Sequence, residues 1–452
     1  MRVKRNGRSE KLTVTADGDG LVSHAGTALL CAVADRLGLT DALDRELEEL
    51  FERVPRHAAG RVLRDLAVAV ADGGEHLADI AVLRDQPALF GPVASDSTAY
   101  RLIERIAAAP GALERVRAAR AETRARVWRR FDGARPREIV IDIDASLLSS
   151  HSEKQGAAGN FKGGYGFHPM LAYLDHSGEA LAGVLRPGNA GANTAADQIA
   201  VLDAALAQLP QRVAARWPVL MRADSAGATH ELMAFCRDGR VRFSVGYDLT
   251  EPVRAAIDAL PETAWQPTIT QDGHWRQDGA MVAEITALLD LAAWPDRSRV
   301  LVRRERPHPG AQLSFTDAGG HRFQAVLTDQ SDADIAYLEA RHRGHARVED
   351  RIRTGKDTGM GKLPFREFAM NEVWLELSLI AQDLLAHTRL LCLTGELARC
   401  EPKRLRYRLL HTAARLTAHA RQARLRLDRR WPWAGELAAA FARLSALPAP
   451  TR

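Results

Sequence analysis

The chain has 452 residues, of which 46% are hydrophobic, and a formal net charge of +5 at pH 7. This length allows a large buried core and more than one domain, and so mild an excess of positive charge permits nucleic-acid binding without requiring it. The four cysteines form no C-x-x-C pair, which indicates neither a zinc site nor a disulfide framework. The chain has no apolar run of about 18 residues and no signal-peptide pattern, so we expect a cytoplasmic protein without a membrane partner.

The N-terminal region is predicted to be helical. Residues 1 to about 20 are basic and then rich in Gly and Asp, which favours an arm or a short hairpin. From about 25 to 130 apolar residues recur three and four positions apart, as on one face of a helix. One helix in this region has a candidate cap at Ser95, Asp96 or Ser97. The pattern suits a DNA-binding helix-turn-helix and equally a helical bundle with a solvated charged face, so residues 1–130 are expected to be helical with DNA contact left open.

From residue 137 the pattern becomes that of an α/β layer. Alternating residues predict a strand at 137–146, followed by a Gly/Lys loop and two more strands. A helix at about 193–209, a strand ending at Asp224, a helix at 228–237 and a further strand come next. The order β-β-β-α-β-α-β predicts a mixed sheet flanked by helices, with an antiparallel start and a parallel continuation.

The rest of the chain divides by composition. Four strand-like runs between turn signals predict a β-rich segment, and after about residue 332 the pattern is helical to the end. The expected parts are a first core segment (137–249), the β-rich insertion (250–330), a second core segment (331–395) and a helical C-terminal region (396–452). Dense arginine over 403–430 is typical of a solvated face and also fits a phosphate backbone.

Carboxylates stand at the ends of two apolar strands. In "VIDIDAS", Asp142 and Asp144 share one face of a strand whose other face is isoleucine. In "VLMRADSAG", Asp224 stands where the strand ends. Ligands of parallel α/β sheets bind at the carboxyl ends of the strands. A single aspartate there is usually a turn or helix cap, but two of them favour a functional site.

A third group lies on one predicted helix. His342, His345, Glu349 and Lys356 fall at offsets 0, 3, 7 and 14, which keep to one helical face. An exposed, salt-bridged face would give the same pattern. The chain has only seven lysines, and four of them flank the acids in the surrounding loops: Lys154, Lys162, Lys356 and Lys362. A compact ammonium suits a phosphate, so these loops are candidate phosphate contacts.

Three remote carboxylates that converge need a cation, because they would otherwise repel one another. Mg²⁺ prefers oxygen ligands, and two such ions about 4 Å apart promote phosphoryl transfer by activating the attacking oxygen and stabilising the leaving oxygen. We expect Asp144 to be the direct ligand because it lies nearer the strand end. Asp142 is either an outer partner of the site or a structural acid satisfied by an arginine.

These motifs together resemble the DDE transposases of bacterial insertion sequences, in the branch called DDE domain group one. The resemblance covers nearly the whole chain, and "DIDASLLSSHSEKQGAAGNFKGGYGFHP" is its most specific stretch. It implies a ribonuclease H-like core in which Asp144, Asp224 and Glu349 are the catalytic, metal-binding acids, with two Mg²⁺ ions for which Mn²⁺ can substitute. Lys356 fits the family's Tyr-Arg-Glu-Lys signature, whereas the chain departs from it at His342 and His345.

The resemblance also implies a function and partners. The expected activity is binding of terminal inverted repeats, cleavage of double-stranded DNA and strand transfer into target DNA, by a dimer at the bacterial nucleoid. The six residues expected to contact DNA are Lys356, His342, His345, Lys154, Lys162 and Lys362. The 125 positions between Asp224 and Glu349 (349 − 224) fit the family's insertion, where Trp265 and Trp275 either pack or stack on a flipped base. A nuclease without strand transfer and a domesticated, non-catalytic DNA-binding regulator are the alternatives.

Overall fold

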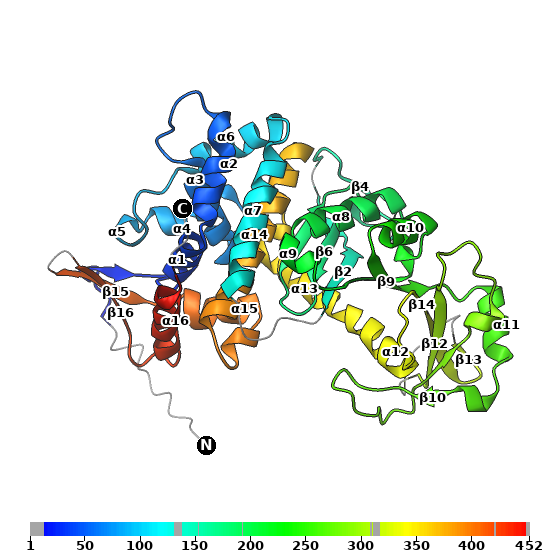
Figure 1. The fold of residues 1–452 in the computed structure, drawn as a ribbon. Coiled ribbons are helices and arrows are strands. Elements are labelled where there is room, and N and C mark those ends of the chain that lie inside the picture. Colours follow the sequence, from blue (N-terminus) through cyan, green and yellow to red (C-terminus); the bar gives the residue numbers. More distant parts are fainter. Residues whose placement is uncertain are drawn as a thin grey trace, which may run out of the picture.

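The computed structural model describes residues 13–130, 138–151, 153–191, 193–307, 310, 317–419 and 422–448. It has a helical lobe, which contains both ends of the described chain, and a lobe built on one large sheet (Figure 1). The first twelve residues of the expected N-terminal arm lie outside the described residues. No described helix is long and apolar enough to cross a membrane.

The core sheet has the predicted antiparallel start and parallel continuation. Its strands run β7-β6-β2-β8-β9, with β6 and β7 antiparallel and β8 parallel to β2, and β9 parallel to β8. The bounds are β2 (Ile139–Ala145), β6 (Met170–Leu174), β7 (Ala180–Val184), β8 (Val219–Ala223) and β9 (Val241–Tyr247). Helices α8 (Ala195–Ala207), α9 (Gln211–Ala214) and α10 (His230–Asp238) occupy the connections. The predicted mixed sheet flanked by helices is thereby confirmed.

The β-rich segment continues this sheet. Strand β14 pairs antiparallel with β9, and β12, β11 and β10 follow, so that one ten-stranded sheet results. The bounds are α11 (Glu251–Asp258), β10 (Gln266–Pro267), β11 (Met281–Glu284), β12 (Arg299–Glu305), β13 (Asp317–Ala318) and β14 (His321–Thr328). The insertion is strand-rich as predicted, but it adds to the edge of the core sheet, because an edge strand leaves backbone groups free to pair.

The helical lobe is formed by the N-terminal helices around the long helix α14 (Phe368–Cys392), which is buried along most of its length. The others are α1 (Thr27–Leu37), α2 (Leu39–Leu47), α3 (Ala59–Ala71), α4 (Ala81–Arg84), α5 (Pro87–Phe90), α6 (Asp96–Ala108) and α7 (Ala112–Arg130). Of the three predicted caps, Ser95 is the N-cap of α6, where its hydroxyl accepts from the Thr98 amide at 3.3 Å. The predicted helical region is confirmed.

The C-terminal region is only partly helical. It contains α15 (Pro402–Leu405) and α16 (Ala434–Ala446), but also a hairpin of β15 (Ala414–His419) and β16 (Gln422–Leu427). Strand β1 (Leu21–Val22) pairs with β15 and completes a small sheet. The prediction of helix to the end of the chain was wrong here. The alternation of Arg424, Leu425, Arg426 and Leu427 has the period of a strand, and the dense arginine obscured it.

Buried ion pairs join the two lobes. Arg124 of α7 is fully buried and donates to Glu179, beside β7, at 3.0 Å, and also pairs with Asp383 of α14. Arg120, one turn earlier on α7, pairs with Asp383 at 2.9 Å and with Glu376. Every charge in this interface has a partner of the opposite sign, which is the condition for holding charges in a low-dielectric interior.

Candidate active site at the sheet edge

The two strand-end aspartates are adjacent because β2 and β8 are parallel neighbours. Their register pairs Asp142 with Arg222, an offset of 80 residues. The same offset carries Asp224 beside Asp144 (224 − 144 = 80), one pleat closer to the carboxyl ends of the strands. Asp224 follows β8 immediately and is exposed, and Asp144 is half-buried. The two carboxylates thus lie side by side at the carboxyl ends of the strands, as the sequence predicts.

A glycine on β9 lets the Asp224 turn close over the strand ends. The Asp224 Oδ1 accepts from the Ala226 amide at 3.1 Å and so starts a single helical turn. A Cβ at Gly246 would lie 2.6 Å from the Ser225 nitrogen and 3.0 Å from the Asp224 carbonyl carbon. Only a residue without a side chain allows this approach, so Gly246 positions Asp224. Sequence reasoning did not single out this glycine.

Glu349 reaches the same edge from a helical segment. Helix α12 (Ile335–Arg343), a 3₁₀ turn (Gly344–Ala346) and α13 (Arg347–Gly355) run on almost without a break, and α13 packs against β2 and β6. Glu349 and Asp224 line one cleft of about 510 Å³, together with His342 and His345. The helical stripe predicted from residue spacing thus faces the strand-end acids.

Asp144 lies among other acids and forms no ion pair with an arginine in the described part of the chain. Burial first, and then the negative charges of Asp224 and Glu349, raise the pKa of Asp144 to about 6, against the opposing effects of His345 and of the hydrogen bond from the Ala145 amide. Asp224 and Glu349 therefore lie close enough to Asp144 for their charges to act on it. An arginine partner of the kind seen in the lobe interface is missing from the described surroundings of Asp144.

Asp142 has the opposite environment. Its side chain is 2% exposed and forms a two-pronged ion pair with Arg222, Nε to Oδ1 and Nη2 to Oδ2, each at 2.8 Å. The Nδ1 of His345 lies 2.9 Å from Asp142 Oδ1. Asp142 is therefore a structural acid paired with an arginine, the second of the two roles considered. It also holds the ring of His345 in place. Arg222 was missed from the sequence, although its spacing from Asp224 matches that of Asp142 from Asp144.

The other stripe residue, His342, is held in the cleft wall. Its Nδ1 lies 3.1 Å from Ser244 Oγ on β9. Burial, with the nearby positive charges of His345 and Arg222, lowers the pKa of His342 to about 3. Its ring is therefore neutral at physiological pH and can act on a phosphate only as an uncharged hydrogen-bond donor.

The four lysines have different surroundings. Lys356 Nζ donates to the Leu147 carbonyl at 3.0 Å and lies close enough to Asp144 to feel its charge, although burial lowers the lysine's pKa. Lys162 is exposed beside the Phe161 ring. The other two are tied to different groups: Lys154 donates to the Leu363 carbonyl, and Lys362 pairs with Glu75 at 3.2 Å. Lys356 is thus the lysine nearest the acids.

The two tryptophans of the insertion also differ. Trp265 is 8% exposed and packs in the sheet core, with Phe323 beside it and Arg304 over its ring at 4.3 Å. Packing is therefore the role that the structure gives Trp265. Trp275 is 60% exposed and leaves its ring free for another contact.

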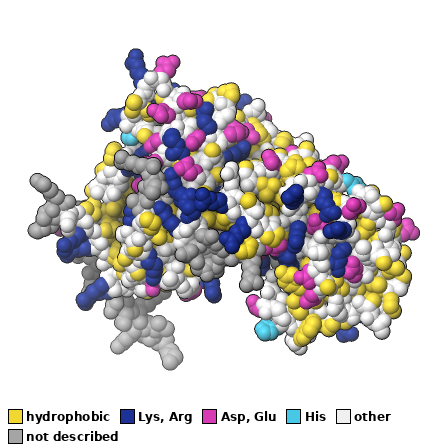
Figure 2. All heavy atoms as spheres, in the orientation of Figure 1, with side chains coloured by type: hydrophobic (Ala, Val, Ile, Leu, Met, Phe, Trp, Pro, Cys, Tyr) yellow, Lys and Arg dark blue, Asp and Glu magenta, His cyan; other side chains and the backbone are white. Residues whose placement is uncertain are grey.

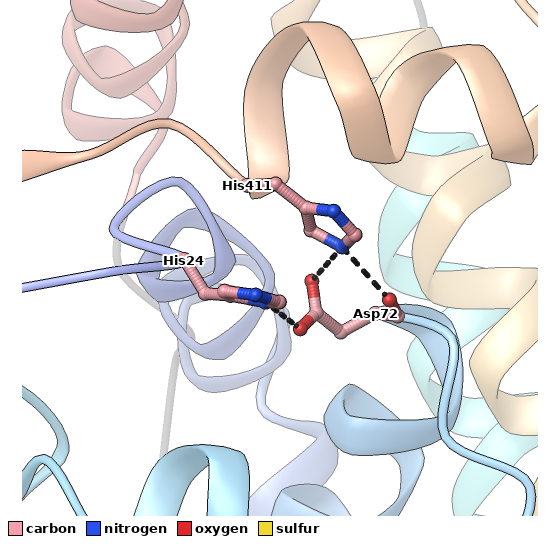
Figure 3. A group of neighbouring side chains, drawn as sticks. All are labelled: His24, Asp72 and His411. Carbon is pink, nitrogen blue, oxygen red and sulfur yellow. Dashed lines mark hydrogen bonds and ion pairs between the residues drawn. The ribbon is translucent and has the colours of Figure 1, made fainter. Parts of the chain in front are cut away.

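A second titratable cluster lies in the helical lobe. His24, Asp72 and His411 are the one trio in the described part of the chain with ligand atoms all within 4.8 Å of one another (Figure 3). The Nδ1 of His24 lies 2.5 Å from Asp72 Oδ2, and Nε2 of His411 lies 3.1 Å from the Asp72 carbonyl. A carbonyl oxygen only accepts, so Nε2 carries a proton and donates; a metal ligand would present a lone pair instead. The trio is a hydrogen-bonded clamp in this arrangement.

The cleft acids fit divalent cations better. Asp144, Asp224 and Glu349 supply only carboxylate oxygens, the ligands that Mg²⁺ prefers, and burial together with the charges of Asp224 and Glu349 raises the pKa of Asp144. Two cations shared among three acids do not require all three to converge on one point. The donor set therefore suits a pair of hard divalent ions.

The fold is a mixed sheet flanked by helices, with three acids near the carboxyl ends of two neighbouring parallel strands. The chain belongs to the family "transposase DDE domain group 1", whose model matches residues 4–449. Membership makes it a transposase-family protein, which implies an enzyme that cleaves and joins DNA and generally uses a divalent metal. The resemblance seen in the sequence motifs is confirmed.

Two further comparisons complete the picture. No curated protein is significantly similar to the chain in sequence. Among solved structures, a piggyBac transposase in a synaptic complex with hairpin DNA is similar, with 8% identity, a TM-score of 0.42, and coverage of 85% of this chain and 80% of that chain.

Proposed function

We propose that this protein is the transposase of a bacterial insertion sequence, which binds terminal inverted repeats, cleaves the DNA at the element's ends and transfers the cut strands to target DNA. The observation that carries the proposal is the meeting of three acids from remote segments: Asp224 and Glu349 line one cleft, and both act electrostatically on Asp144, which forms no ion pair with an arginine in the described part of the chain. Family membership supports the same reading.

Asp144, Asp224 and Glu349 would hold two Mg²⁺ ions, for which Mn²⁺ can substitute. When bound, such ions supply activation of the attacking oxygen and stabilisation of the leaving oxygen. The acids fix the position of the site at the carboxyl ends of β2 and β8. A DNA strand would enter through the open side of the cleft. Asp142 stays with Arg222 and keeps the strand ends in register.

The histidines of the cleft and the lysines of the surrounding segments would position the DNA. The ammonium of Lys356, beside Asp144, is placed to hold a terminal phosphate. His345, whose Nδ1 faces Asp142, presents its other ring nitrogen to the cleft, and neutral His342 offers a hydrogen bond without charge. Lys162 contacts the backbone from its exposed loop, whereas Lys154 and Lys362 do so by exchanging their present partners for phosphate.

Two ends of an element require two active sites, so we propose a dimer in the DNA complex. The double-stranded substrate carries an inverted repeat at each end, and each protomer would act on one of them. A chromosomal substrate would place the protein at the nucleoid of a bacterial cell.

The test is an end-cleavage and joining assay on the DNA that flanks the reading frame, with Mg²⁺ and with EDTA. Asp224→Asn and Glu349→Gln should lower cleavage on the order of 10³-fold, since metal-ion catalysis contributes several kcal/mol and each 1.36 kcal/mol is tenfold. Both variants should bind the repeats as the wild type does. Asp350→Asn is the matched control, because Asp350 neighbours Glu349 but is exposed and pairs with Arg353.

Three outcomes contradict the proposal in different ways. Full cleavage by Asp224→Asn in Mg²⁺ excludes the carboxylate site. Wild-type cleavage without joining of pre-cut ends to a plasmid leaves a nuclease. Repeat binding without any cleavage by the wild type leaves a non-catalytic DNA-binding protein.

A further inference from the structure

The hairpin of β15 and β16 projects from the helical lobe, away from the sheet that holds the cleft (Figure 1). The stretch 411–430, which contains it, has six arginines and one acid, Asp428, a balance of +5 (6 − 1) that equals the formal charge of the whole chain. We call β15, β16 and the paired strand β1 the basic arm. The basic arm therefore carries a local excess of positive charge, whereas the rest of the chain is close to neutral.

The strand register gathers these arginines on one face. Arg415 lies directly opposite Arg426, and Thr417 lies opposite Arg424. Residues directly opposite or two apart share a face, so Arg415, Arg424 and Arg426 point the same way, and all three are exposed. Like charges in directly opposite positions destabilise a sheet. The Arg415–Arg426 pair therefore does not stabilise the hairpin, which suggests that these arginines bind another molecule.

The other face of the arm is apolar and points back to the protein. Leu416, Leu425 and Leu427 alternate with the arginines and are half-buried, and Leu427 packs against the core of the helical lobe. The arm therefore lies with a fixed face outward. Figure 2 shows dark-blue cationic side chains on this projecting part of the surface.

The three arginines differ from those that hold the fold together by ion pairs. Arg120, Arg124 and Arg222 each pair with an acid, as do many of the surface arginines. In the described part of the chain, Arg415, Arg424 and Arg426 form no ion pair with an aspartate or glutamate. Three unpaired cations in a row across two strands leave an excess of positive charge for an external anion.

The base of the arm is fastened at both of its ends. His24 follows β1 by two residues and His411 precedes β15 by three, and both rings bond to Asp72 at the end of α3 (Figure 3). The Leu416 amide also donates to the Gly20 carbonyl at 2.7 Å. The arm is thus held in a set orientation before any partner arrives, which reduces the entropy cost of binding.

We propose that the basic arm is a second double-stranded DNA contact, in which Arg415, Arg424 and Arg426 bind phosphates of the duplex outside the cleavage cleft. A two-stranded ribbon has the dimensions that the major groove of B-DNA admits, and the guanidinium fork matches phosphate geometry. The inference rests on the proposed function for the identity of the polyanion. It adds a binding surface that the carboxylate cleft does not contain.

The test is the triple variant Arg415→Gln, Arg424→Gln and Arg426→Gln, compared with the wild type in binding to a fluorescent duplex at several salt concentrations. Loss of three phosphate contacts should lower the slope of log K against log salt by about 2.7 and weaken binding roughly 10- to 100-fold at low salt. Since the three side chains are exposed, the melting temperature should stay within about 1 °C of the wild-type value.

A charge-matched control separates the arm from general electrostatics. Arg212→Gln, Arg216→Gln and Arg242→Gln remove the same charge from exposed positions around the starts of β8 and β9, at the opposite end of these strands from Asp224. This control should keep the wild-type slope to within about one unit. Equal losses in both triple variants would overturn the proposal, because the arm would then contribute only net charge.

The two proposals fail separately. A wild-type protein that binds and cleaves end DNA, with an arm variant that binds at every salt concentration as the wild type does, overturns the arm contact alone. A wild type that neither binds nor cleaves DNA overturns the proposed function as well. Loss of self-association in the arm variant with unchanged DNA affinity also overturns the arm contact, since a second copy of the chain would then be its partner.

Discussion

The lobe interface and the cleft at the sheet edge are both rich in carboxylates, but their charges are treated in opposite ways. In the interface, Glu179 and Asp383 are buried against Arg124, and every charge has a partner. Beside the cleft, Asp144 is half-buried with Asp224 and Glu349 as neighbours, and its pKa is raised. The comparison shows that the buried acids with a structural role are paired with arginine. Acids left without one are the candidates for binding an external cation.

The largest effect should come from breaking the compensated region. Arg124→Met leaves Glu179 and Asp383 with fewer cations in the interior and should lower the free energy of unfolding by about 3–5 kcal/mol. Arg129→Met, on the same helix but exposed, should change it by less than about 0.5 kcal/mol. Urea denaturation of the three proteins measures both values. Equal, small effects would mean that the interface does not depend on its ion pairs.

An intermediate effect should come from the uncompensated region. Mg²⁺ at 100 times its dissociation constant should stabilise the wild type by about 2.7 kcal/mol, because it binds the folded state only. Asp144→Asn should lose this stabilisation and, without Mg²⁺, should melt above the wild type, since one of three repelling charges is gone. Thermal melts with Mg²⁺ and with EDTA give the comparison, and Asp350→Asn should respond as the wild type does. A full Mg²⁺ response in Asp144→Asn would contradict the assignment of Asp144 as a ligand.

The smallest effect concerns the clamp at the base of the arm, where a histidine replaces arginine as the partner of an acid. Burial opposes ionisation of Asp72, but hydrogen bonds from His24 and His411 outweigh it and lower the pKa of Asp72 to about 2. The hydrogen bond to Asp72 raises the pKa of His411, against burial and the charge of Arg406. The proton on His411 thus stabilises the fold below pH 6.5, and this contribution is lost as the pH rises through the raised pKa.

The expected consequence is a fall in unfolding free energy between pH 5.5 and pH 8.5 that His411→Gln reduces. Its size should be below about 1 kcal/mol, because the His411 side chain is 38% exposed and solvent screens the pair. Below pH 3.8 the contribution of Asp72 declines instead, as the carboxylate is protonated towards its lowered pKa. An identical pH dependence in the variant would show that the clamp does not titrate in this range.

Much of the candidate site followed from local patterns. Alternation around Asp142 and Asp144 predicted strand β2, and the turn after Asp224 predicted the end of strand β8. Both features depend on residues two to four positions apart. Helical spacing put His342, His345 and Glu349 on one face, and all three line the cleft. Lys356, the fourth residue of the predicted stripe, follows the end of α13 and donates to the Leu147 carbonyl. The roles of these residues in catalysis and DNA binding remain predictions.

The parts that sequence reasoning missed depend on remote neighbours. The insertion strands were expected as a separate β-rich part, yet β14 pairs with β9 and extends the core sheet. Strand pairing over such distances has no local signal in one sequence. The basic arm did have one, since Arg and Leu alternate in β16, but the helical composition around it prevailed in the prediction.

By itself, the sequence determined the hydrophobic periodicity of the helices and strands, the ends of the strands and the positions of acids and arginines along the chain. Each of these depends on a few consecutive residues. Only the tertiary structure decided which acids are neutralised. Asp142 and Asp144 stand two residues apart on one strand, and the register with β8 gives the first to Arg222 and leaves the second beside Asp224. Charge compensation is a property of neighbours in space, and a single pleat of the sheet separates a structural acid from a candidate ligand.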